Sequence, residues 1–157
     1  MDQAKLDFIC KDYVHLMNGL PAETKGKFGK MNIQQVVEHL SDVFKISSGK
    51  LKLDLVTPVE HLPRYMDFLY SDKEFRENTK APANILPEEP AVVRLASIGE
   101  ALAELQNEIN AFADFFSNNP GKKTLHPVFG DLNFEEWVLL HYKHVTHHLR
   151  QFGDDLN

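Results

Sequence analysis

Apolar residues recur at helical spacing in four separate stretches of the chain, and this periodicity is the strongest constraint on its fold. The stretches cover about residues 2–18, 32–49, 97–118 and 133–151. In each one an apolar side chain returns every three or four residues, as expected of a helix that buries one face. No two segments show the alternation that is typical of paired strands. The sequence therefore predicts an all-α protein built as an up-and-down four-helix bundle.

Local signals indicate where the helices begin and end. Asn32 with Gln35, and Asn133 with Glu136, have the spacing of capping boxes at the starts of the second and fourth helices. A Gly-Leu-Pro sequence at positions 19–21 ends the first helix, because proline cannot continue it.

A long irregular section separates the second and third helices. Residues 54–96 cannot form one helix, because they contain Pro58, Pro63, Pro82, Pro87 and Pro90. A short helix is possible over Leu62–Tyr70. Sections of this length in a compact domain are usually functional, so we expect this excursion to shape the mouth of any site that the bundle holds. Tyr65, Phe68 and Tyr70 either line that mouth or pack against the bundle.

Length and charge narrow the classes of function. With 157 residues and 43% hydrophobic content, residues 1–157 are expected to form a single domain with one core. The net charge is -6, and the 17 basic residues are scattered among 23 acidic ones. A surface that binds nucleic acid normally shows clustered lysine and arginine, so we expect no nucleic-acid partner.

Cysteine and hydropathy indicate the compartment. The single cysteine, Cys10, cannot form an internal disulfide. Charged residues interrupt the first twenty positions or so, where a signal peptide needs an apolar run, and no run approaches the ~20 apolar residues of a membrane helix. We therefore expect a cytoplasmic protein without a membrane partner.

The last helix carries four histidines, at positions 141, 144, 147 and 148. At about 100° per residue, His144 and His148 lie roughly 40° apart and one turn apart, a separation that lets two imidazoles bind one metal ion. His141 and His148 share a face with Trp137, where the apolar stripe is expected. Three explanations stay open: a metal site, a buried polar network, or exposed histidines near a helix end.

A third metal ligand must come from elsewhere, and His39 in the middle of the second helix is the natural candidate. A lone histidine on an amphipathic helix is often a core residue with satisfied ring nitrogens, so this alternative also stays open. His15, His61 and His126 are weaker candidates, because they lie near a helix end, in the excursion, and before a proline in a loop.

Two runs around these histidines, residues 31–42 (MNIQQVVEHLSD) and 144–151 (HVTHHLRQ), resemble the DinB/YfiT-like superfamily of four-helix-bundle, metal-dependent proteins. The region from His126 to Gly153 is similar to a bacterial subfamily of unassigned function. The superfamily binds a divalent metal, commonly zinc or nickel, through one histidine of the second helix and two spaced by four on the last. The resemblance therefore implies a mononuclear site formed by His39, His144 and His148.

Neighbouring residues can support such a site. His147 points about 80° to 100° away from the next histidine and is expected to orient a ligand or to pair with the backbone. Asp42, one turn beyond His39, either orients that ring or is a surface residue, and His141 is a further supporting candidate. Many superfamily members have a glutamate after the first histidine of the last-helix motif, whereas this chain has Val145, so the usual carboxylate is missing.

Three neutral imidazoles leave the charge of a metal ion uncompensated and a coordination position open. A water molecule there is acidified toward a pKa of about 7, and a thiol binds as its thiolate. The resemblance implies a thiol-dependent transferase or a hydrolase that acts on a small-molecule substrate, with a low-molecular-weight thiol as a possible co-substrate. The alternative is a non-catalytic metal-binding or ligand-binding protein, which the lack of an evident acid or base beside the ligands favours.

The third helix has a wide apolar stripe, which bears on assembly. The stripe comprises Ile98, Leu102, Leu105, Ile109, Phe112, Phe115 and Phe116. It exceeds what one four-helix core is expected to hide, so a homodimer through exposed helix faces is predicted, as is common in the superfamily. The alternative is that the excursion covers this surface within a monomer.

Overall fold

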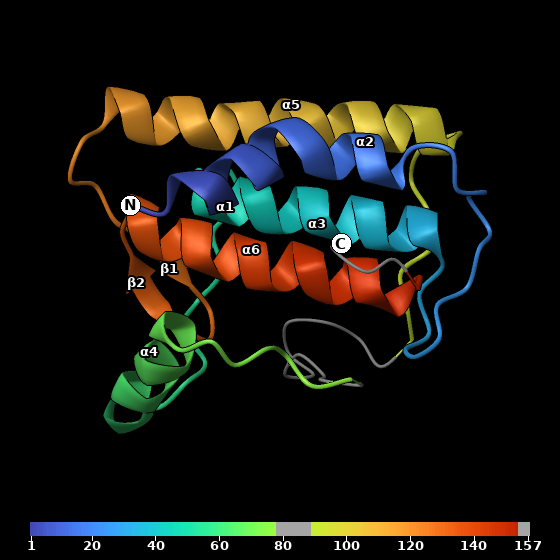
Figure 1. Ribbon diagram of the computed structural model, residues 1–157. Helices are drawn as coiled ribbons and strands as arrows, with labels where there is room; N and C mark the ends of the chain where they lie inside the picture. Colours follow the sequence, from blue (N-terminus) through green and yellow to red (C-terminus); the bar gives the residue numbers. More distant parts are fainter. Residues whose placement is uncertain (78–88, 154–157) are drawn as a thin grey trace.

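The computed structural model describes residues 1–77 and 89–153, and helices dominate it (Figure 1). In chain order the elements are α1 (Gln3–Asp7), the π-helical turn η1 (Phe8–Asp12), α2 (Tyr13–Met17), α3 (Ile33–Ser47), the 3-10 turn η2 (Val59–His61), α4 (Leu62–Tyr70), α5 (Ile98–Asn118), β1 (Thr124–His126), β2 (Gly130–Leu132) and α6 (Phe134–Gln151). The predicted helical bundle is confirmed, including the short helix α4 within the excursion.

The first predicted helix is one continuous rod with a π-helical turn in its middle. α1, η1 and α2 follow one another without a break, and Asp2 caps the start by accepting a hydrogen bond from the Lys5 backbone N–H at 3.1 Å. Ile9, Tyr13 and Met17 are spaced by four residues and are fully buried. The rod therefore buries a single stripe against the rest of the bundle.

Both predicted capping boxes are present. The Asn32 side chain accepts from the Gln35 N–H at 2.9 Å, and the Gln35 side chain accepts from the Asn32 N–H at 2.8 Å. Asn133 and Glu136 form the same pair of bonds at 2.9 and 3.0 Å. These bonds satisfy backbone donors that have no partner within the helix, and they fix the first residues of α3 and α6.

The excursion determines the directions of the helices. α3 packs mainly against α5, and both helices run from right to left in Figure 1, opposite to α6 and to the N-terminal rod. The chain leaves α3 at one end of the bundle and returns through the excursion to the other end before α5 begins. Neighbouring helices α3 and α5 are therefore parallel and joined by a long crossover connection, so the helical bundle is as predicted but successive helices do not all alternate in direction.

The apolar stripe of α5 packs within a single chain. Its buried residues are Ala101, Leu102, Leu105, Ile109, Phe112 and Phe116, and Ile98 and Phe115 pack partly buried against the same core. The stripe that suggested a homodimer is thus accounted for inside the monomer, and dimerisation stays a prediction without that argument.

The connection before α6 contains a β-hairpin, so the expectation of no strand pairing was wrong. β1 and β2 are antiparallel and pair Thr124 with Leu132 and His126 with Gly130. Strands of three residues are too short to show an alternating pattern, so the hairpin could not be predicted from periodicity. The Thr124 hydroxyl donates to the Ser47 carbonyl at 2.8 Å and accepts from the Trp137 indole at 2.7 Å, so the hairpin joins α3 to α6.

The first part of the excursion packs near the hairpin. The Tyr65 and Phe68 rings contact Phe129 at centroid distances of 5.6 and 6.4 Å, and the exposed Tyr70 donates to Glu136 at 3.4 Å. Tyr65 and Phe68 thus pack against the core, which was one of the two alternatives, whereas Tyr70 remains largely exposed. Residues 78–88 of the excursion lie outside the described residues. Within residues 1–77 and 89–153, none of the helices has the length and apolar character needed to cross a membrane.

Removal of the α6 cap tests this account of the fold. We expect Asn133→Ala to lower the free energy of unfolding by about 1 kcal/mol, because the Glu136 N–H loses its partner. Urea denaturation followed by circular dichroism measures the change. Asn107→Ala, on the exposed face of α5, is the matched control and is expected to cause no loss. Equal stabilities of the two variants would contradict the role of the cap.

Candidate metal centre

Three histidines from two helices converge inside the bundle. His39 comes from α3, and His144 and His148 come from successive turns of α6. The His144 Nε2 atom lies 3.2 Å from His39 Nε2 and 3.1 Å from His148 Nε2. One ring nitrogen of each residue lies within 4.8 Å of those of the other two, so the cluster can hold a metal ion. The one-turn spacing predicted from sequence brings together the expected residues.

The spacing of the ring nitrogens suits a metal ion. At zinc–nitrogen distances of about 2.0–2.1 Å, two ligands of a tetrahedral site lie about 3.3 Å apart. The two contacts of His144 Nε2, at 3.1 and 3.2 Å, are close to this value. The ring nitrogens of the third pair, His39 and His148, lie within 4.8 Å of each other, so the donor set and two of its three spacings fit a divalent cation.

Burial keeps the cluster neutral. Loss of solvent lowers the pKa of His39 from its usual value near 6.5 to about 4, and that of His148 to about 3, with the charge of His39 adding to the effect on His148. Burial, reinforced by the neighbouring histidines, also holds the pKa of His144 well below its usual range. The three imidazoles thus present lone pairs at neutral pH, as metal ligands must.

Hydrogen bonds among the three rings cannot satisfy all of the ring nitrogens that face one another. The His148 Nδ1 atom faces the Gln151 Oε1 acceptor at 2.8 Å, so the hydrogen of this neutral ring resides on Nδ1 and none is left on Nε2. His144 Nε2 would then have to share one hydrogen between His39 and His148. A cation at the centre accepts a lone pair from each of the three rings, which favours the metal reading over a hydrogen-bond network.

His147 lies beside the cluster and points away from it. Its ring contacts Phe28 and Phe75 at centroid distances of 5.3 and 5.9 Å. Burial lowers the pKa of His147, while a hydrogen bond with the Phe75 backbone opposes that shift. Its ring is therefore packed between aromatic side chains, and its role as a supporting residue of the cluster stays a prediction.

His141 belongs to a polar contact in the core. It is fully buried, stacks on Phe44 at 3.7 Å and on Trp137 at 5.2 Å, and its Nε2 lies 3.0 Å from Ser47 Oγ. Ser47 Oγ in turn donates to the Phe44 carbonyl at 2.8 Å, which makes His141 the donor to Ser47. His141 Nδ1 finds no hydrogen-bond partner among the described residues. The alternatives for the histidines of the last helix therefore apply to different residues. His144 and His148 belong to the candidate metal cluster, whereas His141 makes a polar contact in the core.

Asp42 is directed at cations and not at His39. Its carboxylate lies 3.7 Å from Lys45 Nζ and 3.8 Å from the Arg94 guanidinium, and its side chain is 49% exposed. Among the described residues, no carboxylate forms a hydrogen bond with the three clustered rings. The missing carboxylate noted at Val145, which is buried in the core, is therefore not replaced by Asp42.

The excursion flanks the cluster on two sides. Along α6, Lys143 donates to the carbonyls of Ser71, at 2.8 Å, and Lys73, and the Phe75 ring lies 6.3 Å from that of His144. Along α3, the buried Glu38 accepts from the Arg94 N–H at 2.6 Å. The described parts of the excursion thus contact both helices that supply the histidines, and its role in shaping the mouth of the site stays a prediction.

The remaining histidines lie elsewhere. His15 and His61 are exposed. His126 Nδ1 accepts from the backbone N–H groups of Val128 and Phe129, at 2.9 and 3.2 Å, and so stabilises the hairpin turn.

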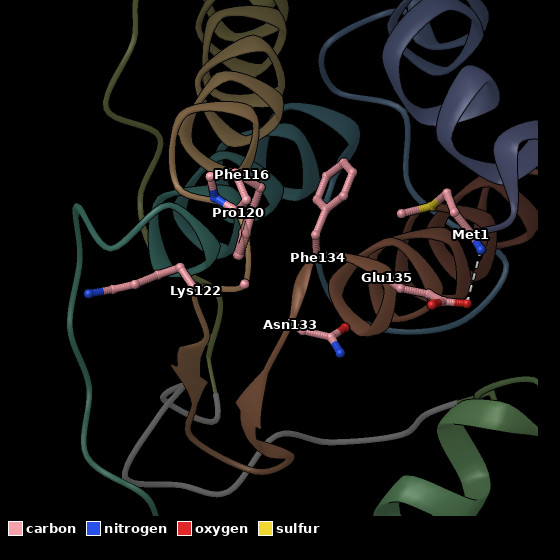
Figure 2. Close-up of a pocket in the computed structure, with 8 residues that line it drawn as sticks. Met1, Phe116, Pro120, Lys122, Asn133, Phe134 and Glu135 are labelled. Carbon is pink, nitrogen blue, oxygen red and sulfur yellow. Dashed lines mark ion pairs between the residues drawn. The ribbon is translucent and has the colours of Figure 1, made fainter.

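A surface pocket lies away from the histidines. Figure 2 shows Met1, Phe116, Phe134 and Glu135 around this pocket, which sits at the start of α6. The Met1 ammonium forms an ion pair with Glu135 at 3.2 Å. A rise of 1.5 Å per residue puts His144 about 14 Å further along α6, so the pocket is separate from the cluster.

The helical bundle and its three-histidine cluster define a class of protein that the sequence comparison identifies. The family model described as the DinB superfamily matches residues 6–152. The chain belongs to the DinB superfamily. Comparisons with curated proteins and with solved structures found no match.

The lowered pKa values predict an acid-sensitive fold. Between about pH 6.5 and pH 4, His39 and His148 bind protons in the unfolded chain but stay neutral in the folded protein. The free energy of unfolding of the metal-free protein is therefore expected to be highest above about pH 6.5. As the pH is lowered further, it is expected to decrease by up to about 1.4 kcal/mol per pH unit for each such histidine.

Urea denaturation in the presence of a chelator measures this profile. His15→Gln removes an exposed histidine and is expected to leave the profile unchanged. A stability that stays constant across the window would show that the cluster is not held neutral by burial.

Proposed function

We propose that this protein is a metal-dependent enzyme in which His39, His144 and His148 hold one divalent ion, zinc or nickel. The observation that carries the proposal is the convergence of the three rings, with His144 Nε2 3.1 and 3.2 Å from its two neighbours. Membership of the DinB superfamily supports it. Imidazole nitrogen is a preferred ligand of both metals.

The charge around the cluster favours a strongly polarising site. Among the described residues no carboxylate forms a hydrogen bond with the three rings, and the Asp42 carboxylate lies 3.7 Å from Lys45 Nζ and 3.8 Å from the Arg94 guanidinium instead. A divalent ion held there would supply Lewis-acid activation of a water molecule or a thiol. The protein contributes three neutral ligands on two rigid helices, one buried and two partly buried, which keep the donor atoms in place without compensating that charge.

We further propose a small-molecule substrate and either thiol-dependent transfer or hydrolysis as the reaction, with transfer from a low-molecular-weight thiol preferred. The aromatic ring of Phe75 beside His144 offers an apolar contact at the edge of the cluster. Neither reaction requires a protein nucleophile, in keeping with a site built from imidazoles alone.

A non-catalytic metal-binding protein is the second candidate. It is favoured by the absence, among the described residues, of a carboxylate that hydrogen-bonds to the cluster. His147, the nearest further titratable ring, is engaged with Phe28 and the Phe75 backbone. Such a protein would bind the ion and leave a thiol or ester unchanged.

Metal analysis tests the ligand set. We expect about one zinc or nickel ion per chain in untagged protein, and loss of that ion in His39→Ala, His144→Ala and His148→Ala, because two imidazoles bind far more weakly than three. His15→Ala and His61→Ala change exposed residues and are expected to retain the ion. Full metal content in a variant of the cluster, determined by elemental analysis, would refute the assignment.

Cobalt substitution tests the preference for a thiol. We expect a low-molecular-weight thiol to produce the near-ultraviolet absorption of a cobalt–sulfur bond in the cobalt-loaded protein, because an open coordination position accepts a soft ligand. The matched alcohol is the control and is expected to leave the spectrum unchanged. A spectrum insensitive to the thiol would favour the hydrolase or the non-catalytic protein.

A further inference from the structure

The side chain of Gln151 connects His148 to a distant loop. Gln151 ends α6, one turn after His148, and its Oε1 lies 2.8 Å from His148 Nδ1. Its Nε2 donates to the Phe28 carbonyl at 2.7 Å. The Gln151 carbonyl also accepts from the Lys27 N–H at 2.7 Å. Gln151 is thus held at three points, and two of them lie in the loop before α3.

These contacts fix the proton on His148. The Phe28 carbonyl can only accept, so the Gln151 amide must turn its nitrogen toward Phe28 and its oxygen toward His148. An amide oxygen can only accept, so the His148 ring must carry its hydrogen on Nδ1. Nε2, the atom that faces His144, is left with its lone pair.

Two glycines make room for this side chain. A β-carbon on Gly26 would collide with Gln151 Cγ, and one on Gly29 would lie 2.6 Å from Gln151 Nε2. Gly29 also has a φ of +76°, a conformation that other residues rarely adopt. The segment Gly26–Gly29 therefore forms a socket for Gln151.

We propose that Gln151 is a positioning residue of the metal centre: held by the Gly26–Gly29 socket, it keeps His148 in the tautomer and ring orientation that present Nε2 to the ion. The inference rests on the proposed metal site. Groups that hydrogen-bond to the second nitrogen of a ligand histidine typically contribute about 10–100-fold to metal affinity. A neutral amide does so without adding negative charge, so the ion keeps its full polarising power.

Zinc affinity and the proton position on His148 test the proposal together. We expect Gln151→Met and Gly29→Ala each to weaken zinc binding by about tenfold or more in a chelator competition, with the stoichiometry retained. In metal-free protein, nitrogen-15 NMR of the imidazole rings is expected to show His148 protonated on Nδ1 in the wild type. That preference is expected to be lost in Gln151→Met, which a purely structural role of Gln151 would not cause.

Two variants serve as matched controls. Gln106→Met removes another side-chain bond to a backbone carbonyl, that of Cys10, in a different part of the bundle. Gly49→Ala imposes the same backbone strain as Gly29→Ala, since Gly49 has a φ of +77°, but its β-carbon would meet nothing within 4 Å. Both controls are expected to stay within about twofold of wild-type zinc affinity.

The outcomes separate this inference from the proposed function. Wild-type zinc affinity in Gln151→Met or Gly29→Ala, or a wild-type His148 protonated on Nε2, would overturn it. If the wild-type protein binds neither zinc nor nickel, the proposed metal site fails. The NMR result then still decides whether Gln151 sets the His148 tautomer: protonation on Nδ1 that depends on Gln151 supports this part of the inference, and any other tautomer refutes it.

Discussion

The ring nitrogens of buried histidines need hydrogen-bond partners or a metal ion, and the rest of the structure depends on this requirement. The α6 helix turns His141, His147 and His148 into the bundle, where an unpaired polar group is costly. Neighbouring residues pair with one ring nitrogen of two of them: Ser47 of α3 accepts from His141, and Gln151 accepts from His148. The His147 ring packs against Phe28 and Phe75. The nitrogens left over on His39, His144 and His148 face one another, and together they form the candidate metal centre.

α6 divides into two halves with different tasks. Its first half carries Trp137, which the hairpin residue Thr124 ties to α3, and this end of the bundle is built for packing. Its second half carries the clustered histidines, and the segments packed on it are the Gly26–Gly29 socket and the excursion around Phe75. Rigid helices thus hold the donor atoms, whereas loops adjust their orientation and their surroundings, a common division in sites that bind small molecules.

Much of this was readable from the sequence because it depends on local spacing. Apolar periodicity fixed the main helices, and Asn32 and Asn133 marked two helix starts through bonds that span three residues. The one-turn separation of His144 and His148 is likewise a property of a single helix. The pairing of these two with His39 came from the resemblance to a family, since no spacing rule connects residues 105 positions apart.

The tertiary structure decided what depends on contacts between distant segments. Asp42 lies one turn from His39 and was a candidate to orient it, but its carboxylate lies 3.8 Å from the guanidinium of Arg94, a residue of the excursion. The hairpin was invisible because three-residue strands carry no periodic signal. Gln151 is the clearest case: its sequence position says only that it follows His148 by one turn, and its task depends on a loop more than 120 residues away, where two glycines leave the space for its side chain. Local periodicity determines the helices and the faces they bury, whereas the partner of each buried polar atom is determined only when the chain has closed around it.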